Sequence, residues 1–298
     1  RIHGLVAKRF ATNPWILGYD PMNEPADYSP VEIDGRYYSP GLSCLYAGSS
    51  GASQTISTHE PLPCPAQAPK TGVIQAIEAV DKQHLVFPEA DNASRGDHPY
   101  LLGNIALPRI VFNFHVYCAQ RSGVTGNPTD LAACSNSELS SMVTRSMERA
   151  QMTTSNNPLG PAMFMTEFGA TDSKELASLL TADTTTLGLG WMWWSWRYYD
   201  DPTGSSAEAL INDQNVYSPA ASTVSTTYPM AVAGTPVSSV LNTDDGLYTL
   251  TYLPKKAATA PTVVFISESL YPKGYCSVVV GGSITSKPGS PYLTIEAA

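Results

Sequence analysis

The first 200 residues alternate between short apolar segments and stretches with helical periodicity, and this alternation limits the chain to few folds. The apolar segments have the length and the β-branched or aromatic residues that are typical of buried strands. They are residues 15–20, 85–88, 110–117, 163–168 and 191–196, and helical spacing is found near residues 2–10, 71–82, 137–154 and 173–182. Strands that alternate with helices form parallel βαβ units. The sequence therefore predicts an α/β fold with five parallel strands in this part.

The pattern changes at about residue 222, after which helical periodicity is no longer found. Segments of alternating apolar and polar residues follow, separated by turn residues such as those at 244–246 and 281–282. The segments are residues 247–252, 262–266, 275–280 and 292–295. Short strands with this spacing predict a small β-sandwich. We therefore expect two domains, residues 1–221 and residues 222–298.

Residues with catalytic chemistry stand where three of the five predicted strands end. The first strand leads to Glu24, the third carries His115 and Tyr117, and the fourth ends at Glu167. The carboxyl ends of parallel strands meet at one rim of a (β/α) barrel, so the two glutamates can face one substrate. Paired carboxyl groups are typical of glycoside hydrolysis, in which one protonates the leaving oxygen and the other attacks or positions water.

Other acidic residues lie close to these strand ends. Asp20 precedes the first motif and is predicted to be a structural hydrogen-bond partner rather than a catalyst. Glu89 and Asp91 follow the second strand, where contact with substrate and a solvated loop are both open. Because isolated loop carboxylates are usually solvated, we favour the solvated loop for these two.

Four motifs together resemble those of family 5 glycoside hydrolases of clan A. They are the glutamate before Pro25, the His-x-Tyr pair, the glutamate before Phe168 and the tryptophan-rich last strand. These are retaining enzymes with a (β/α)8 TIM barrel. Residues 228–236 resemble the junction that leads into the C-terminal β-sandwich of endoglycoceramidases and glucosylceramidase-like members. The resemblance implies that Glu24 is the acid/base, that Glu167 is the nucleophile, and that the substrate-binding residues are Asn23, His115, Tyr117 and Trp194. Trp191 and Trp193 alternate with Trp194 and are expected to pack against helices.

The activity that the resemblance implies is that of a retaining β-glycosidase, which cleaves the bond between a glucosyl-headed glycan and a lipid such as ceramide. A family 5 glucanase that acts on polysaccharide is one alternative. A catalytically silent member that serves as a binding or structural component is another. No cofactor is expected, and no metal either, because His59 and His98 lack partners at metal-binding spacing.

Five strands are too few for a (β/α)8 barrel, which takes about 250 residues. In the family that the chain resembles, the strand before the Asn-Glu-Pro motif is the fourth, so this chain is expected to carry strands 4–8. We expect strands 1–3 to be supplied by a separate chain or by sequence not represented here. A truncated form with a scaffold role is the alternative.

The charge and the cysteines limit the partners and the compartment. The formal net charge is −9 and no run of lysine or arginine is present, so nucleic acid is not expected as a partner. We predict two loop-closing disulfides, Cys44–Cys64 and Cys118–Cys134, with Cys276 unpaired; free thiols are the alternative. Together with a glycosylation acceptor at Asn92, they indicate a secreted or vacuolar/lysosomal protein. No apolar segment is long enough to span a membrane, so contact with a membrane surface is expected to be peripheral.

Overall fold

The structure is a computed structural model that describes most of the chain. The described residues are 2–26, 31–33, 36–49, 64–89, 100–102, 105, 107–118, 130–151, 160–199, 208–242 and 244–298. The chain divides into two compact units. The first comprises residues 1–123, 128–170 and 186–195, and the second comprises residues 124–127, 171–185 and 196–298.

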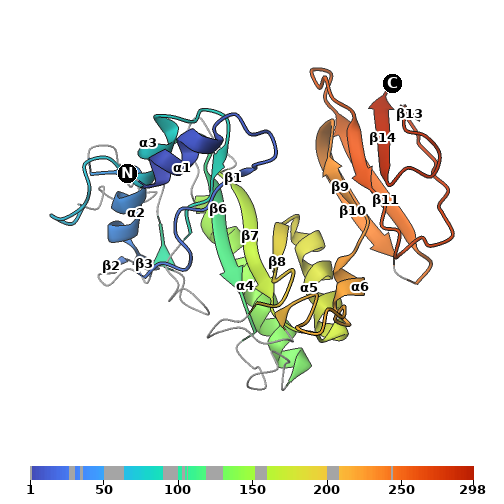
Figure 1. Ribbon diagram of the computed structural model, residues 1–298, viewed down its shortest axis with the longest axis horizontal. Coiled ribbons are helices and arrows are strands. Elements are labelled where there is room, and N and C mark those ends of the chain that lie inside the picture. The colour runs from blue at the N-terminus through green and yellow to red at the C-terminus, as the bar shows by residue number, and fades with distance from the viewer. Residues whose placement is uncertain are drawn as a thin grey trace. The chain divides into compact units, whose positions relative to one another are not determined.

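Five parallel strands follow one another in chain order in the first unit (Figure 1). They are β1 (Gly18–Tyr19), β4 (Leu85–Val86), β6 (Val111–Val116), β7 (Ala162–Gly169) and β8 (Gly190–Trp194). β1 pairs with β4, and β6, β7 and β8 pair in that order, all in parallel. Isolated parallel bridges, Val86 to Ile110 and Glu89 to Asn113, connect β4 to β6. The predicted α/β fold is confirmed, because parallel strands in chain order are the arrangement of a barrel wall.

In the part of the chain that the structure describes, four helices lie where the periodicity predicts them, one before β1 and three between the strands, and two further helices were not predicted. Among the described residues they are α1 (Ile2–Phe10), α2 (Pro40–Ala47), α3 (Val73–Glu78), α4 (Leu131–Gln151), α5 (Lys174–Leu187) and α6 (Ala221–Val224). A small sheet of β2 (Val31–Ile33), β3 (Arg36–Tyr38) and β5 (Tyr100–Leu101) accompanies the long excursion after β1. β6 is buried along its whole length and forms the centre of the core. None of the helices in the described ranges is long and apolar enough to cross a membrane.

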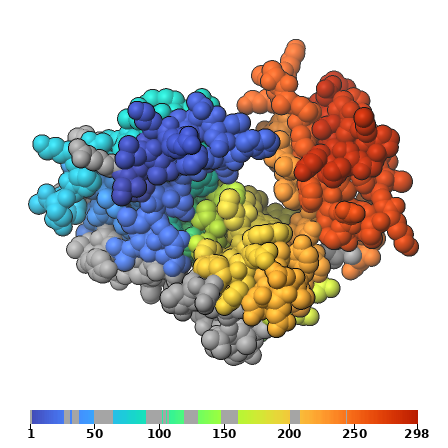
Figure 2. Space-filling model, viewed as in Figure 1, coloured from blue at the N-terminus to red at the C-terminus, as the bar shows by residue number. Residues whose placement is uncertain are grey.

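The first strand is shorter than predicted. It begins at Gly18 rather than at residue 15, and Trp15 is 93% exposed. The side chain of Asn13 accepts a hydrogen bond from the N–H of Trp15, and its carbonyl accepts one from Ile16, so the turn after α1 extends through these residues. The chain around α1 is dark blue in Figure 2, where it forms part of the surface.

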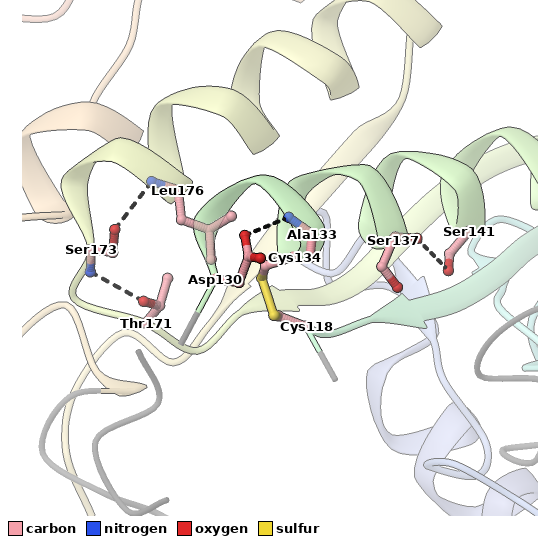
Figure 3. Close-up of a disulfide and its surroundings, with 9 residues drawn as sticks. All are labelled: Cys118, Asp130, Ala133, Cys134, Ser137, Ser141, Thr171, Ser173 and Leu176. Atoms are coloured by element: carbon pink, nitrogen blue, oxygen red, sulfur yellow. Dashed lines mark hydrogen bonds between the residues drawn. A yellow bond between two sulfur atoms is a disulfide. The ribbon is translucent and has the colours of Figure 1, made fainter. Parts of the chain in front are cut away.

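Both predicted disulfides are present, and Cys276 is free and exposed. The Cys118–Cys134 bond ties the residues that follow β6 to the first turn of α4 (Figure 3). This helix begins at Leu131, so the predicted start at Ser137 is wrong. Asp130 caps the helix, because its side chain accepts a hydrogen bond from the N–H of Ala133 at 3.0 Å.

The C-terminal part of the second unit is an all-β domain of two antiparallel sheets. Its strands are β9 (Tyr228–Ala231), β10 (Gly234–Asn242), β11 (Leu247–Pro254), β12 (Thr262–Phe265), β13 (Gly282–Ile284) and β14 (Tyr292–Ala297). One sheet has the order β13-β14-β12-β9 and the other pairs β10 with β11. Val264, Leu293 and Ile295 of the larger sheet form a buried cluster on which Tyr248 and Leu250 of β11 pack. The two sheets therefore face each other as a sandwich; the boundary at residues 221/222 stays a prediction.

Four segments of this domain differ from the prediction, and two of them, β9 and β13, are strands that were not predicted. Residues 275–280 do not form a strand, and Val278 and Val280 are 90% and 95% exposed. β10 was not predicted, because Pro236 and the serine pair at 238–239 interrupt its apolar alternation. It nevertheless pairs with β11, with a register shift between Pro236 and Ser238. The apolar pattern fails at residues 275–280 and in β10 because neighbouring strands, and not burial alone, decide where a strand forms.

Candidate active site

Glu24 lies in the turn that follows β1 and has a left-handed backbone. Its φ is 41°, a conformation that costs a residue other than glycine about 1–2 kcal/mol. Its N–H donates a hydrogen bond to Oε2 of Glu89 at 2.6 Å. Its Oε1 lies 3.1 Å from Nδ1 of His115. Glu24 is thus held through both its main chain and its side chain.

Glu167 lies near the end of β7 and is the ladder partner of His115 in β6. Tyr117 donates a hydrogen bond from its hydroxyl to Oε2 of Glu167 at 2.5 Å. Nδ1 of His115 is 3.4 Å from the same oxygen. Because β6 and β7 are parallel, their carboxyl ends bring these three side chains together at one rim.

The structure therefore brings together four of the six predicted site residues: Glu24, His115, Tyr117 and Glu167. One atom from each of Glu24, His115 and Glu167 can be chosen so that all three lie within 4.8 Å of one another. Hydrogen bonds within the cluster account for this proximity, so we assign no metal to it. The roles of these residues in catalysis stay a prediction.

A chain of hydrogen bonds behind His115 shows that its Nε2 carries a hydrogen. Asn113 is fully buried and donates from Nδ2 to Asp20 at 2.9 Å. Its Oδ1 therefore accepts from the hydroxyl of Thr166, at 2.5 Å. The oxygen of Thr166 then accepts from Nε2 of His115 at 3.0 Å. Nδ1 faces the carboxyl groups as a result, and Asp20 is the structural partner that the sequence predicts.

Three carboxyl groups surround Nδ1 of His115. Glu24, Glu89 and Glu167 each place an oxygen near it, at 3.1, 3.4 and 3.4 Å respectively. Burial opposes the charged form of the imidazole, but the hydrogen bond to Glu24 and the charges of Glu89 and Glu167 outweigh it. The pKa of His115 is therefore raised above its ordinary value.

Glu89 is a site residue that the sequence reasoning missed. The prediction of a solvated loop is wrong, because Glu89 is only 4% exposed and contacts the main chain of Glu24. Burial raises the pKa of its carboxyl group to about 8. Glu89 follows β4 and bridges to Asn113, so it lies at a strand end like the two predicted glutamates. The same rule would have found it, but Glu89 was interpreted as an isolated loop carboxylate, which is usually solvated.

Asn23 directly precedes Glu24 in the chain, and Trp194 belongs to β8, the strand that pairs with β7. Asn23 is exposed beside Glu24. Trp194 ends β8, is half-buried, and is the ladder partner of Gly169. Four residues that carried sequence predictions lie outside the described residues: Asp91, Asn92, His59 and His98.

Trp191 and Trp193 pack against an aromatic residue of the neighbouring strand. Each has its ring centroid 5.1 Å from that of Phe168, in edge-on geometry. Because successive residues of a strand point to opposite faces, this is the face opposite to Glu167. This packing is consistent with the expectation that both tryptophans point away from the cleft. The residue that they contact is Phe168 of β7, however, and not a helix residue as expected.

Two family descriptions match the chain. Residues 2–200 match Cellulase (glycosyl hydrolase family 5), and residues 227–298 match the Glycoside hydrolase family 5 C-terminal domain. The chain therefore belongs to glycoside hydrolase family 5.

Within this family the chain is similar to endoglycoceramidases. It is 26% identical over 306 residues to Endoglycoceramidase I of Rhodococcus hoagii (strain 103S), which covers 99% of this chain and 54% of that protein. The solved structure of endo-glycoceramidase II from Rhodococcus sp. in its ganglioside GM3 complex has a TM-score of 0.65 at 20% identity, over 99% of this chain and 59% of that chain. The structure of the lactosyl-enzyme intermediate of that protein has a TM-score of 0.61 at 21% identity, again over 99% of this chain and 59% of that chain. The chain thus spans about half the length of the curated relative, and the structures show a shared fold.

Proposed function

We propose that this chain carries the two catalytic carboxyl groups of a retaining β-glycosidase, which hydrolyses the bond between a glucosyl-headed glycan and a lipid. The observation that carries the proposal is that oxygens of Glu24 and Glu167 both lie beside Nδ1 of His115, at 3.1 and 3.4 Å. Facing atoms of these three residues lie within 4.8 Å of one another. Retaining glycosidases keep their carboxyl groups about 5–5.5 Å apart, whereas inverting enzymes leave about 6.5–9.5 Å for a water molecule. The close placement therefore favours retention.

The proposed reaction has two steps. First, a carboxylate oxygen of Glu167 attacks the anomeric carbon, the bond to the aglycone oxygen breaks, and Glu24 gives that oxygen its proton. Water then attacks the anomeric carbon and loses a proton to Glu24, and the bond to Glu167 breaks to release the sugar. The hydrogen bond from Tyr117 stabilises the ionised form of Glu167 and orients it for the first step.

The glycolipid class of substrate is supported by the similarity to endoglycoceramidases along almost the whole chain. The match to the Cellulase description supports a polysaccharide as the second candidate. Asn23 is proposed to hold a sugar hydroxyl, and Trp194 to stack on a sugar ring. Both contacts are common to the two substrate classes, so they do not discriminate between them.

We propose as partner the N-terminal part of the same barrel, on a separate chain or in sequence that precedes this one. The two disulfides support an oxidising compartment, and we propose a secreted or vacuolar/lysosomal location. Contact with a membrane surface would then be peripheral. Nucleic acid is not proposed as a partner of this acidic chain.

The test is mass spectrometry of the products after the chain, together with the N-terminal part of the barrel, is incubated with glycosphingolipids. We expect intact glycan and ceramide from the wild type and from Glu175→Gln, which changes an exposed carboxyl group on α5. We expect neither product from Glu167→Gln. Products from glucans alone would move the assignment to polysaccharide, and no product from either class would overturn the proposal of an enzyme.

A further inference from the structure

Glu89 is the buried carboxyl group of the site that the proposed mechanism does not use. Its side chain contacts two residues of the site: Oε2 accepts from the N–H of Glu24 at 2.6 Å, and Oε1 is 3.4 Å from Nδ1 of His115. Its own main chain is fixed as well, because its carbonyl accepts a hydrogen bond from the hydroxyl of Tyr46 at 3.1 Å. Glu89 thus links α2, the end of β4 and the turn after β1.

The contact with the main chain of Glu24 coincides with a strained conformation. The φ of 41° at Glu24 lies in the left-handed region, which residues other than glycine adopt only when the surroundings hold them there. The carboxyl oxygen of Glu89 supplies such a constraint, because it accepts the N–H that this conformation turns toward it. Without an acceptor, this partly buried N–H would lose its hydrogen bond and the turn could relax.

We propose that Glu89 is a positioning residue, which holds the main chain of Glu24 in the left-handed conformation and thereby aims its carboxyl group at the glycosidic oxygen. This inference rests on the proposed glycosidase function. Glu89 itself does not touch the substrate in this role and exchanges no proton with it. A misplacement of the acid/base by about 1 Å can cost roughly 100-fold in rate, so the constraint matters for catalysis.

The protonated form of Glu89 suits this role. Ionisable groups face it from every neighbouring element: Asp20 and Glu24 after β1, Tyr46 of α2, His115 of β6 and, through His115, Glu167 of β7. Burial, with smaller contributions from the charges of Asp20 and Glu24, raises the pKa of Glu89 to about 8, although the charge of His115 and the hydrogen bond from the N–H of Glu24 oppose this shift. A neutral carboxyl group still offers an oxygen to the N–H of Glu24. It also adds no negative charge beside the two carboxyl groups that react.

Two substitutions separate positioning from packing. Glu89→Gln keeps the volume, the neutral state and an acceptor oxygen, whereas Glu89→Met keeps the volume and removes the acceptor. For Glu89→Met we expect kcat to fall roughly 10- to 100-fold while KM changes less than about twofold. For Glu89→Gln we expect kcat within about threefold of wild type below pH 7, so that the conservative variant rescues the rate. Wild-type kcat in Glu89→Met, or equal losses in both variants, would overturn the proposal.

A second measurement does not depend on turnover. The sample is this chain together with the N-terminal part of the barrel, labelled with ¹⁵N-glutamate. We expect the NMR chemical shift of the Glu24 amide proton to change with pH, with a midpoint near pH 8, where the carboxyl group of Glu89 ionises. This change should disappear in Glu89→Gln and Glu89→Met and persist in Glu175→Gln. If the wild type hydrolyses nothing but this titration is present, the proposed function fails and the contact that positions Glu24 stands. A Glu24 amide that does not respond to the ionisation of Glu89 would overturn the positioning role, whatever the activity.

Discussion

A carboxyl group that folding removes from water makes stability depend on pH. The pKa of Glu89 is raised to about 8 from an ordinary value of 4.5, chiefly by burial. Because the pKa is higher in the folded state than in the unfolded state, protonation of Glu89 contributes to stability, and this contribution is fully present below about pH 4.5. This contribution is lost as the pH rises through 8, with a slope of at most about 1.4 kcal/mol per pH unit.

We therefore expect Glu89→Gln to lose less stability than the wild type between pH 5 and pH 8.5. Urea unfolding of the complete barrel at these two values measures the difference. Glu175→Gln, on an exposed helix turn, should follow the wild type. A wild-type curve as flat as that of Glu89→Gln would contradict the burial argument.

A second prediction at the residue scale concerns Tyr117, which donates a hydrogen bond of 2.5 Å to Glu167. Tyr117→Phe keeps the ring, which lies edge-on to His115 at 6.4 Å between centroids, but removes the donor. If Glu167 is the nucleophile, kcat should fall roughly 10- to 100-fold, because a charge-assisted hydrogen bond is lost. The midpoint of thermal unfolding should change by no more than about 2 °C. Unchanged steady-state kinetics would remove Tyr117 from the proposed mechanism.

At the scale of elements, a buried ion pair connects α1, β1 and α3. His84 presents Nδ1 to Oδ2 of Asp81 at 2.6 Å and Nε2 to the carbonyl of Asn13 at 2.9 Å. Both partners only accept hydrogen bonds, so both ring nitrogens donate and His84 is charged. Tyr19 of β1 donates its hydroxyl to the same oxygen of Asp81 at 2.6 Å.

The pH range of this pair follows from its pKa shifts. The hydrogen bond to Asp81 raises the pKa of His84 above 6.5, so the contribution of His84 is lost as the pH rises above that raised value. Burial opposes ionisation of Asp81, but hydrogen bonds from Tyr19, Gln83 and His84 hold its pKa below 3.8. Its contribution is therefore lost only as the pH falls below that value, and the pair stabilises most between about pH 4 and 6.5.

We expect Asp81→Asn to lower the free energy of unfolding by roughly 3 kcal/mol at pH 6, because it leaves the imidazolium buried without its anionic partner. The loss should be smaller at pH 9, where His84 of the wild type is closer to neutral. Chemical denaturation at both pH values checks this. An equal loss at the two values would mean that the pair acts through shape and not through charge.

At the scale of the whole molecule, the series of parallel strands in the first unit is open at both edges in the described part of the chain. Among the described strands, β1 pairs with β4 alone and β8 with β7 alone. The surface near β1 is apolar: Ile2, Leu5, Trp15 and Leu17 are 73%, 68%, 93% and 53% exposed. Unpaired strand edges and exposed apolar side chains are the features that a missing part of a barrel would cover.

We expect the N-terminal part of the barrel, added as a separate polypeptide or joined to this chain, to raise the thermal stability of residues 1–221. The fluorescence of Trp15 should shift to shorter wavelength as the ring leaves water, and Trp15→Phe should remove that change while complex formation persists. The β-sandwich of residues 228–298 offers an internal comparison, because the buried cluster around Val264 is formed by its own residues. A mixture in which neither stability nor fluorescence changes would contradict the proposed partner.

Individual strands and helices show which parts of the fold could be predicted from the sequence. The apolar segments of β6, β7 and β8 predict those strands, because buried parallel strands are apolar on both faces. The His-x-Tyr spacing and the glutamates at strand ends then predict that Glu24, His115, Tyr117 and Glu167 meet, because parallel strands place their carboxyl ends on one rim. Local signals were weaker for α4, whose first turn depends on the Asp130 cap, and for β10, whose polar residues hide its pairing with β11.

The sequence by itself determined the order of strands and helices, the two domains' types and the residues that reach the rim, because periodicity and strand direction are local properties of the chain. Only the tertiary structure decided that Glu89 is buried against the main chain of Glu24, and that Asn113 and Thr166 orient His115. Burial and hydrogen bonding between residues tens of positions apart depend on which strands become neighbours. The protonation of a carboxyl group such as Glu89 depends on those neighbours in turn, and no pattern within its own segment records it.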